Sequence, residues 1–571
     1  MRIVLITVAL LLSACDSPQP PVAEEQDSVA TADLVLRGGK VYTMDAARSW
    51  AEAIAISGGN IVFVGRDSDV APYIGAATRV VELDGHMVMP SFQDSHIHPL
   101  SAGMEAIAID LNDSESLEEY IDKIAAYAAA NPDKQWLLGG GWSMAVFGPG
   151  AMASRRLIDE VVPDRPVYLT SRDGHTGWAN SKALELAGID RDTADPASGR
   201  VDRDPATGDP IGSLQEGAMG LVTRHIPPAD LETRTAGLQY AINLLNNYGI
   251  TAIQDASVDR ESLETYRALE QRGELSLRVV GSIWWERDEG LEQIAQIDEL
   301  RDEFSAGRLR ATTVKIMQDG VMENFTAAVL EPYIGQGGVR GIPMIEPESL
   351  NAAVTALDAA GYQVHFHAIG DAAIRQCLDA VQAARSSNGN NGLRHHISHL
   401  QLIDPTDIPR FRQLGVIANF QPLWAYADEY ITDLTLPYMS AARARWLYPI
   451  ASVQKSGATI AFGSDWSVST ANPFHQIETA ITRMGATGDT QTPFIPIEAI
   501  DLPTALAAFT INAAFVNNLD AVSGSLEAGK AADLVVLDRN LFDIPAEEIS
   551  ETNVLMTLLD GEAVHGNPTL L

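Results

Sequence analysis

The sequence is poor in cysteine, basic residues and aromatic residues, and each shortage narrows the class of protein. Its 571 residues include only two cysteines, Cys15 and Cys377, so a fold stapled by several disulfides is excluded. Lys and Arg number 39 against 76 acidic residues, and the net charge of −37 disfavours binding to nucleic acid or to anionic lipid. Aromatic residues make up 6%, but 46% of residues are hydrophobic, which excludes a disordered chain.

Long apolar runs are also scarce, and the one at the N-terminus is short. Arg2 precedes an apolar run of about ten residues, 3–12, which is too short to span a bilayer as a helix and is typical of a signal peptide. The tetrapeptide Leu-Ser-Ala-Cys that ends at Cys15 resembles a bacterial lipobox, so we expect a signal peptide over 1–14 and a lipid on Cys15. Residues 15–32 are rich in Pro, Ser, Glu and Gln and predict a flexible tether.

These features predict an exported protein of the bacterial envelope that is lipid-anchored and faces the periplasm. A plain secretory signal with an incidental cysteine is the alternative. With Cys15 acylated, only Cys377 would remain, so no internal disulfide could form. The helical spacing around Cys377 predicts a thiol packed in the core.

Short runs that alternate apolar and polar residues bracket the chain. They occur within residues 33–86 and again within 523–571, and glycine-containing turns separate them. Strands this short need partners, so the two segments are expected to form one composite β-sandwich domain.

Between these ends, over residues 87–522, short apolar runs alternate with helical patterns, as in folds built from βα units. About 150 residues separate His98 from Ile250, too many for one βα unit, so the candidate strand Val167–Ser171 is assigned to an insertion over about 105–245. The remaining candidates predict a TIM-like (β/α)8 barrel with its chemistry at the carboxyl ends of the strands. They are 87–93, 250–255, 277–283, 312–317, 363–367, 395–399, 415–420 and 459–463.

Histidines gather in three short clusters at the predicted strand ends. His96 and His98 are two residues apart on the first strand, so both side chains can point into the barrel mouth and hold one metal ion. His365 and His367 share a face of the fifth strand, with His367 nearer the rim. His399 ends the sixth strand. Imidazole groups that converge in this way predict a metal centre.

Two further residues complete the pattern. Asp465 follows the eighth strand, and Lys315 lies near the end of the fourth. A cationic amine beside metal ligands is unfavourable unless it is neutral or chemically converted. The order His-x-His, Lys, His, His, Asp resembles that of the amidohydrolase superfamily. The segments that resemble its amidohydrolase-3 branch are 367–371, 463–466, 510–514 and 524–538.

That resemblance implies a site with one or two metal ions, most often Zn2+, with Mn2+ or Fe2+ as alternatives. The histidines of the first strand would hold one ion, and those of the fifth and sixth strands the other. Lys315 matches the position that many members convert with CO2 into a bridging carbamate. Asp465 matches an aspartate that can both bind metal and move a proton. The implied ligands are His96, His98, Lys315, His367, His399 and Asp465.

Other residues are candidates for the pocket or for the layer behind the ligands. His365 and His395 are expected behind the ligands, whereas His396, of opposite parity, is expected to face the surrounding helices. Ser398 stands where Glu is expected in this branch. Glu216 is assigned either to the pocket or to a capping role. The candidates for substrate binding are Trp142, His175, Gln421 and Trp424.

The combined pattern predicts a metal-dependent hydrolase that cleaves a non-peptide C–N bond in an amide or N-acyl substrate. Asp465 would accept a proton from the attacking water and return it to the leaving amine. One alternative is hydrolysis of an ester or lactone C–O bond on the same site, because fold does not fix substrate. Another is an envelope lipoprotein that binds a metal or ligand without catalysis. The expected partner is a small-molecule substrate, and a homodimer is left open.

Overall fold

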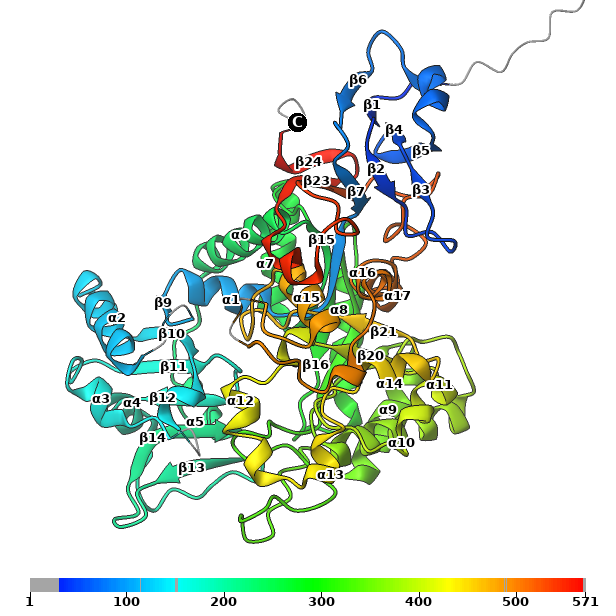
Figure 1. Ribbon diagram of the computed structural model, residues 1–571. Helices are drawn as coiled ribbons and strands as arrows, with labels where there is room; N and C mark the ends of the chain where they lie inside the picture. The colour runs from blue at the N-terminus through cyan, green and yellow to red at the C-terminus, as the bar shows by residue number, and fades with distance from the viewer. Residues whose placement is uncertain are drawn as a thin grey trace, which may run out of the picture.

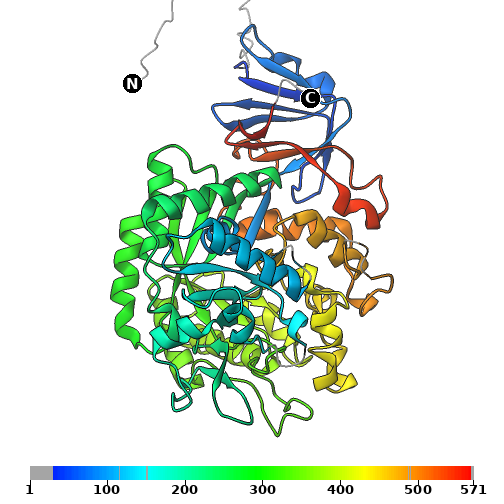
Figure 2. The same cartoon turned by 90° about the vertical axis from the view of Figure 1, so that its left-hand side faces the viewer.

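The chain is described by a computed structural model over residues 30–112, 114, 116–148, 152–486, 488 and 490–567. The predicted signal peptide, Cys15 and most of the predicted tether lie outside these residues. Within the described ranges, no helix is both long enough and apolar enough to cross a membrane. The chain builds a barrel, an inserted sheet beside it, and a small unit of two sheets (Figures 1 and 2).

Parallel strands form a nearly closed barrel, which confirms the predicted TIM-like fold. Its eight strands lie side by side in chain order, and the two edge strands meet where Ser95 Oγ donates to the carbonyl of Phe462 at 2.7 Å. Nearly all their side chains are buried, as expected for strands covered on both faces. The strands are β8 (Phe92–Ile97), β15 (Ile250–Val258), β16 (Arg278–Trp284), β17 (Leu309–Met317), β18 (Gln363–Ala368), β19 (His396–His399), β20 (Ile417–Phe420) and β21 (Ile460–Phe462).

Helices pack around the barrel, and several of them have clear sequence caps. Asp259 accepts a hydrogen bond from the N–H of Ser262 and so begins α7 (Arg260–Gln271). Gly415, with a φ of 66°, ends α11 (Ile408–Leu414) in the left-handed conformation. Other helices of this layer are α6 (Leu231–Asn247), α8 (Ile294–Phe304), α9 (Pro347–Ala359), α10 (Asp371–Asn388), α14 (Ile450–Lys455), α15 (Pro473–Thr482), α16 (Leu502–Ala508) and α17 (Ile511–Val516).

The predicted first strand, residues 87–93, is two strands in the structure, so its bounds were wrong. β7 (Met87–Pro90) pairs with strands of the small unit, whereas the barrel strand begins at Phe92. The N–H of Ser91, between them, donates to the carbonyl of Asp533 at 3.1 Å. Both strands are buried on both faces, so no polar periodicity marks the change of sheet.

Strands from near both ends of the described chain, coloured blue and red, meet in the small unit (Figure 2). Three early and three late strands share one six-stranded sheet, and a four-stranded sheet packs onto it through side chains such as Leu34, Val41 and Val536. The six-stranded sheet contains β2 (Lys40–Tyr42), β3 (Trp50–Ala51), β7, β22 (Leu534–Leu537), β23 (Val554–Leu559) and β24 (Glu562–Gly566). The four-stranded sheet contains β1 (Leu34–Arg37), β4 (Ala53–Ser57), β5 (Asn60–Gly65) and β6 (Arg79–Glu82).

A second sheet is inserted between α1 (Pro99–Ala106) and α6, where the long gap between barrel strands predicts it. The candidate strand Val167–Ser171 lies in this sheet and not in the barrel. Its strands are β9 (Ile109–Asp110), β10 (Leu137–Trp142), β11 (Val167–Ser171), β12 (Thr176–Ala179), β13 (Gly199–Arg203) and β14 (Pro210–Glu216). Its helices are α2 (Leu117–Ala130), α3 (Arg155–Asp159), α4 (Ser181–Ala187) and α5 (Gly220–Thr223).

Candidate metal centre

The side chains assigned to the metal centre surround one cavity at the carboxyl ends of the barrel strands. The cavity has a volume of about 1060 Å3 and is lined by the barrel, the insertion and the loops after the later strands. Because parallel strands end at one face, residues far apart in the sequence converge there. The residues that line it include His96, His98, Lys315, His367, His399 and Asp465.

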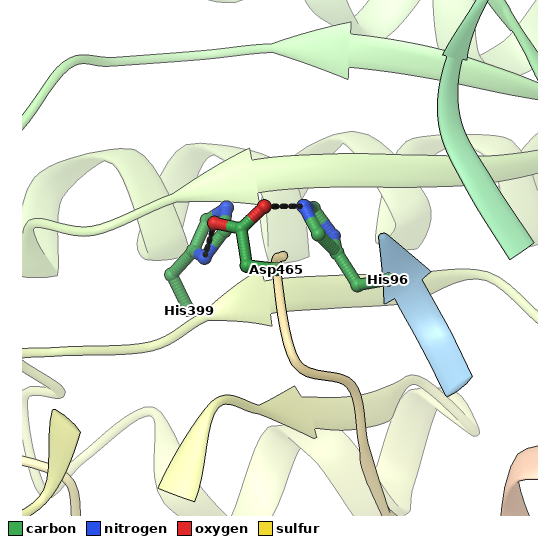
Figure 3. A group of neighbouring side chains, drawn as sticks. All are labelled: His96, His399 and Asp465. Carbon is green, nitrogen blue, oxygen red and sulfur yellow. Dashed lines mark ion pairs between the residues drawn. The ribbon is translucent and has the colours of Figure 1, made fainter. Parts of the chain in front are cut away.

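Asp465 lies between histidines of two different strands (Figure 3). Its Oδ1 is 3.2 Å from Nε2 of His96 and 3.2 Å from Nε2 of His98. Its Oδ2 is 3.8 Å from Nδ1 of His399. One ligand atom from each of His96, His399 and Asp465 lies within 4.8 Å of the others, close enough for one ion to contact all three.

The charge states of these groups suit a metal ion. Burial lowers the pKa of His96 to about 3 and that of His399 well below its ordinary value, so both imidazoles are neutral. Burial opposes ionisation of Asp465, but the adjacent histidines hold its pKa well below the ordinary value. Among the described residues, His96 Nε2, His399 Nδ1 and Asp465 Oδ1 are buried without a hydrogen-bond partner. Neutral imidazoles and a carboxylate whose buried atoms lack hydrogen-bond partners are suitable ligands for Zn2+.

His367 and Lys315 extend the ring of candidate ligands. The ring centroid of His367 lies 4.5 Å from that of His399, and its Nδ1 lies 3.3 Å from Oδ1 of Asp319. Lys315 is 3% exposed, and burial lowers the pKa of its amine to about 7. A substantial fraction of this amine is therefore neutral at physiological pH.

A second layer of polar groups holds His96 from behind. His365 Nε2 lies 2.7 Å from His96 Nδ1, which places His365 where the sequence predicts it. Ser398 Oγ lies 2.9 Å from each of these two nitrogens. The serine that stands in place of the expected Glu thus contacts both rings.

The parity predicted for the histidines of β19 was wrong. His396 faces the barrel interior, where its ring centroid lies 4.2 Å from that of His365. His395 faces outward, and its Nε2 contacts Oδ2 of Asp358 on α9 at 2.9 Å. The alternation of a strand does not extend to His399, because its φ of 78° departs from strand geometry.

His399 shares this positive φ with Asp465, whose φ is 54°. Such a backbone is uncommon for residues other than glycine, and residues of this kind concentrate at functional sites. Both side chains turn into the cavity at the point where the chain leaves the strand.

Two of the predicted substrate residues line the cavity. Trp424 stacks on His399 with 5.4 Å between ring centroids and 11° between planes. The ring centroid of His175 lies 5.2 Å from that of His367. Burial lowers the pKa of His175, but the carboxylate of Glu216, 2.9 Å from its Nδ1, raises it to about 9. Glu216 therefore keeps a charged histidine beside the candidate ligands.

The other two predicted substrate residues do not line the cavity. Trp142 is fully buried in the insertion, where it packs against Phe147 and Trp178. Trp142 is therefore a core residue of the insertion. The glycines that precede it, residues 139–141, do not indicate this packing. Gln421 is also fully buried, and neither atom of its amide has a hydrogen-bond partner among the described residues.

No sequence pattern marks several acids that line the cavity. Apart from Asp255, which lies within β15, they lie in loops or next to the ends of elements, where neither periodicity nor spacing identifies a site residue. Burial raises the pKa of Glu105 and Glu323 to about 7 and that of Asp255 to about 6. The acids that the sequence did not identify are Glu105, Asp173, Asp255, Glu323 and Asp428.

Comparison with known proteins agrees with this geometry. The profile of the amidohydrolase family matches residues 79–565. The protein LONG AFTER FAR-RED 3 of Arabidopsis thaliana is 32% identical to this chain, over 94% of it and 92% of its own length. The N-substituted formamide deformylase of Arthrobacter pascens is 28% identical, over 93% of this chain and 97% of its own length.

Solved structures share the fold. An uncharacterized metal-dependent hydrolase of Pyrococcus horikoshii superimposes with a TM-score of 0.71 at 24% identity, over 90% of this chain and 99% of its own. The family profile spans strands of the small unit, the insertion and the whole barrel. The chain therefore belongs to the amidohydrolase family.

Proposed function

We propose that this chain is a metal-dependent hydrolase of a non-peptide C–N bond in an amide or N-acyl substrate. One observation carries the proposal. Nitrogen and oxygen atoms of His96, His399 and Asp465 that could bind a metal ion are buried close together and have no hydrogen-bond partner among the described residues. Membership of the amidohydrolase family supports hydrolysis, and the relative named as an N-substituted formamide deformylase supports an N-acyl substrate. Hydrolysis of an ester or lactone C–O bond at the same site is the alternative.

The donor set favours zinc, and Mn2+ or Fe2+ can use the same nitrogen and oxygen ligands. When bound, such an ion lowers the pKa of its water from 15.7 towards ~7, which supplies hydroxide at neutral pH. The residues that would hold one or two ions are His96, His98, Lys315, His367, His399 and Asp465.

The side chains around these ligands have separate tasks in the proposed reaction. Asp465, ionised at neutral pH, accepts a proton from the attacking water and delivers it to the leaving nitrogen. Glu216 holds Nδ1 of His175, which leaves the Nε2–H of His175 to stabilise the carbonyl oxygen as it becomes negative. Trp424 packs on His399 and covers one side of the reacting centre with apolar surface.

We further propose that Lys315 is carboxylated. Its neutral amine nitrogen attacks the carbon of CO2: one C–N bond forms, the π electrons of one C=O bond move onto oxygen, and the nitrogen loses one proton to water. The product is an anionic carbamate, which is an oxygen ligand where a protonated amine would be repelled. The lowered pKa of Lys315, about 7, supplies the neutral amine that this step needs.

We propose in addition that the chain is exported and lipid-anchored through Cys15, so that substrate arrives from the periplasm. The N-terminal sequence supports this placement. The cavity volume of about 1060 Å3 suits a small organic substrate, and the acidic composition argues against nucleic acid. Homodimer formation stays a proposal that sedimentation analysis can test.

Metal content and substrate screening test the proposed function. Protein purified without chelator should contain one or two zinc ions per chain, and chelation should abolish turnover that added zinc restores. A panel of N-formyl and N-acetyl amines should be hydrolysed faster than matched esters and lactones. A preference for the esters would support the alternative reaction. Failure to bind any metal on reconstitution would leave a non-catalytic binding protein.

A further inference from the structure

The cavity extends beyond the candidate ligands to a group that we call the acidic wall, formed by Glu323, Asp428 and Tyr448. Glu323 lies in the loop after β17, and Asp428 and Tyr448 lie between β20 and β21. All three side chains line the cavity. Because these loops follow the carboxyl ends of barrel strands, the acidic wall borders the same mouth as the metal centre.

Gln401 connects the acidic wall to the metal centre. Its side-chain Nε2 donates to Oε1 of Glu323 at 3.3 Å, and its backbone carbonyl accepts from the N–H of Tyr448 at 2.8 Å. Gln401 follows His399 by two residues, and two residues of chain span at most about 7 Å. A small substrate whose acyl group lies at the metal centre can therefore reach the acidic wall with its other end.

The two carboxylates of the acidic wall have no lysine or arginine partner among the described residues. The positive groups near the wall have other contacts. His175, which lowers the pKa of Glu323, is held by Glu216. Arg483 donates to the backbone carbonyl of Tyr448.

Glu323 is 6% exposed, and the hydrogen bonds that its Oε1 accepts from Gln401 and Thr435 are long at 3.3 Å. Burial raises the pKa of Glu323 and of Asp428 to about 7; Glu323 raises the pKa of Asp428 further, and Asp173 raises the pKa of Glu323 further. Ionising such a buried pair is costly until a cation arrives.

Two further polar groups at the cavity also lack partners among the described residues. Tyr448 is 3% exposed, and its hydroxyl makes no hydrogen bond to a described residue. Oδ2 of Asp173, another cavity residue close enough to Glu323 to raise its pKa, is buried without a partner. The arginine nearest in sequence, Arg172, instead donates to the carbonyl of Asn112. Acceptor oxygens without partners therefore lie on this side of the cavity, together with Nε of Arg172, which is also buried without a partner among the described residues.

A protonated amine can supply the hydrogen-bond donors that these acceptor oxygens lack. An ammonium group donates up to three hydrogen bonds and accepts none, and carboxylate and phenol oxygens are its acceptors. We propose, resting on the proposed function, that the acidic wall binds a protonated amino group of the substrate. The substrates are then amides or N-acyl compounds that carry a second, cationic nitrogen, and anionic substrates are disfavoured by the same carboxylates.

A matched pair of substrates tests the proposal on the zinc-loaded enzyme. N-(4-aminobutyl)formamide carries an ammonium group where N-pentylformamide carries a methyl group, so the two molecules have equal length and differ in charge. We expect kcat/KM to be at least about tenfold higher for the aminobutyl compound, because hydrogen bonds between charged groups contribute this much when desolvated. Equal values for the two compounds would overturn the proposal.

Isosteric variants test which residues cause the preference for the aminobutyl compound. Glu323→Gln and Asp428→Asn remove a charge and keep the shape of the side chain, and each should lower the ratio of the two kcat/KM values by about tenfold. Glu299→Gln removes an exposed charge on α8, far from the cavity lining, and should leave the ratio unchanged. A ratio unaffected by either cavity variant would overturn the assignment to the acidic wall. Melting temperatures verify that each variant is folded.

A binding measurement separates this proposal from the proposed function. Calorimetric titration with n-butylammonium chloride should show binding that n-butanol does not, and Glu323→Gln should weaken it by about tenfold. If neither formamide is hydrolysed while n-butylammonium binds in this way, the acidic wall is supported and N-formyl hydrolysis is not. If both formamides are hydrolysed but n-butylammonium binds no better than n-butanol, the hydrolase stands and the acidic wall is overturned.

Discussion

Nδ1 of His96 lies 2.7 Å from Nε2 of His365, and Nδ1 of His365 lies 3.1 Å from Oγ of Ser282. Burial lowers the pKa of both histidines, so both rings are neutral and each carries one proton. If His96 binds a metal ion through Nε2, its proton is on Nδ1, and the contacts are then satisfied when His365 accepts from Nδ1–H of His96 and donates to Ser282. The lone pair on Nε2 of His96 is then free to face Asp465 and a metal ion.

This relationship predicts that His365 controls metal affinity without touching the metal. His365→Phe keeps a planar ring but removes one of the two groups, His365 and Ser398, that contact Nδ1 of His96 and fix its tautomer. We expect zinc affinity to fall about 10–100-fold, measured by competition with a chromogenic chelator. His225→Phe, at an exposed position, is the matched control. Wild-type zinc affinity in a folded His365→Phe protein would contradict the arrangement.

Asp465→Asn tests proton transfer separately from metal binding. Asn keeps one oxygen ligand but cannot take up a proton at neutral pH, so we expect kcat to fall about 100-fold to 10,000-fold. Metal content, measured in the same samples, should stay close to that of the wild type because His96, His98 and His399 remain. Asp433→Asn, on the exposed surface, serves as the control. Undiminished turnover in Asp465→Asn would exclude the proton-transfer role.

Lys315 is predicted to carry one molecule of CO2. Native mass spectrometry at neutral pH should show an adduct of that mass, which acidification removes and which peptide mapping places on Lys315. Lys315→Met preserves the buried apolar stem and cannot form a carbamate, so the adduct should be lost and the variant should bind less metal than the wild type. An unmodified lysine in fully metal-loaded wild-type protein would leave Lys315 as an amine in the site.

The barrel and the convergence of the candidate ligands could be predicted because periodicity and strand order determine them. Apolar runs that end in histidine or aspartate indicate strands buried on both faces, and parallel strands must end at one face. This reasoning places His96, His367 and Asp465 around one cavity before any coordinates are known. It fails at residues 87–93, since an uninterrupted apolar run does not show where one sheet ends and the next begins.

The rest of the site depends on packing that a local pattern does not reveal. His395 and His396 exchanged their predicted faces because His399 leaves strand geometry at the position used to set the parity. Glu323 and Asp428 lie in long segments without periodicity, and only the folded chain shows that they line the same cavity. Trp142 has the sequence surroundings of a pocket residue and the contacts of a core residue.

Burial of Glu323 also predicts how stability depends on pH. Its pKa rises from the ordinary 4.5 to about 7, so between these values the folded protein keeps a proton that the unfolded chain releases. The stability linked to this proton is fully present below pH 4.5 and is lost as pH rises through about 7. The total loss is about 3 kcal/mol in the free energy of unfolding.

Glu323→Gln removes the ionisable carboxyl group, so the difference in stability between the variant and the wild type should change with pH. Relative to the wild type, the variant should gain up to about 3 kcal/mol in the free energy of unfolding between pH 5 and pH 8, measured by urea denaturation. Glu299→Gln, at an exposed position, should show no such change. Saturating n-butylammonium should restore stability to the wild type at pH 8, because a bound cation offsets the cost of the buried carboxylate. A stability difference that is the same at both pH values would mean that Glu323 ionises as it does in water.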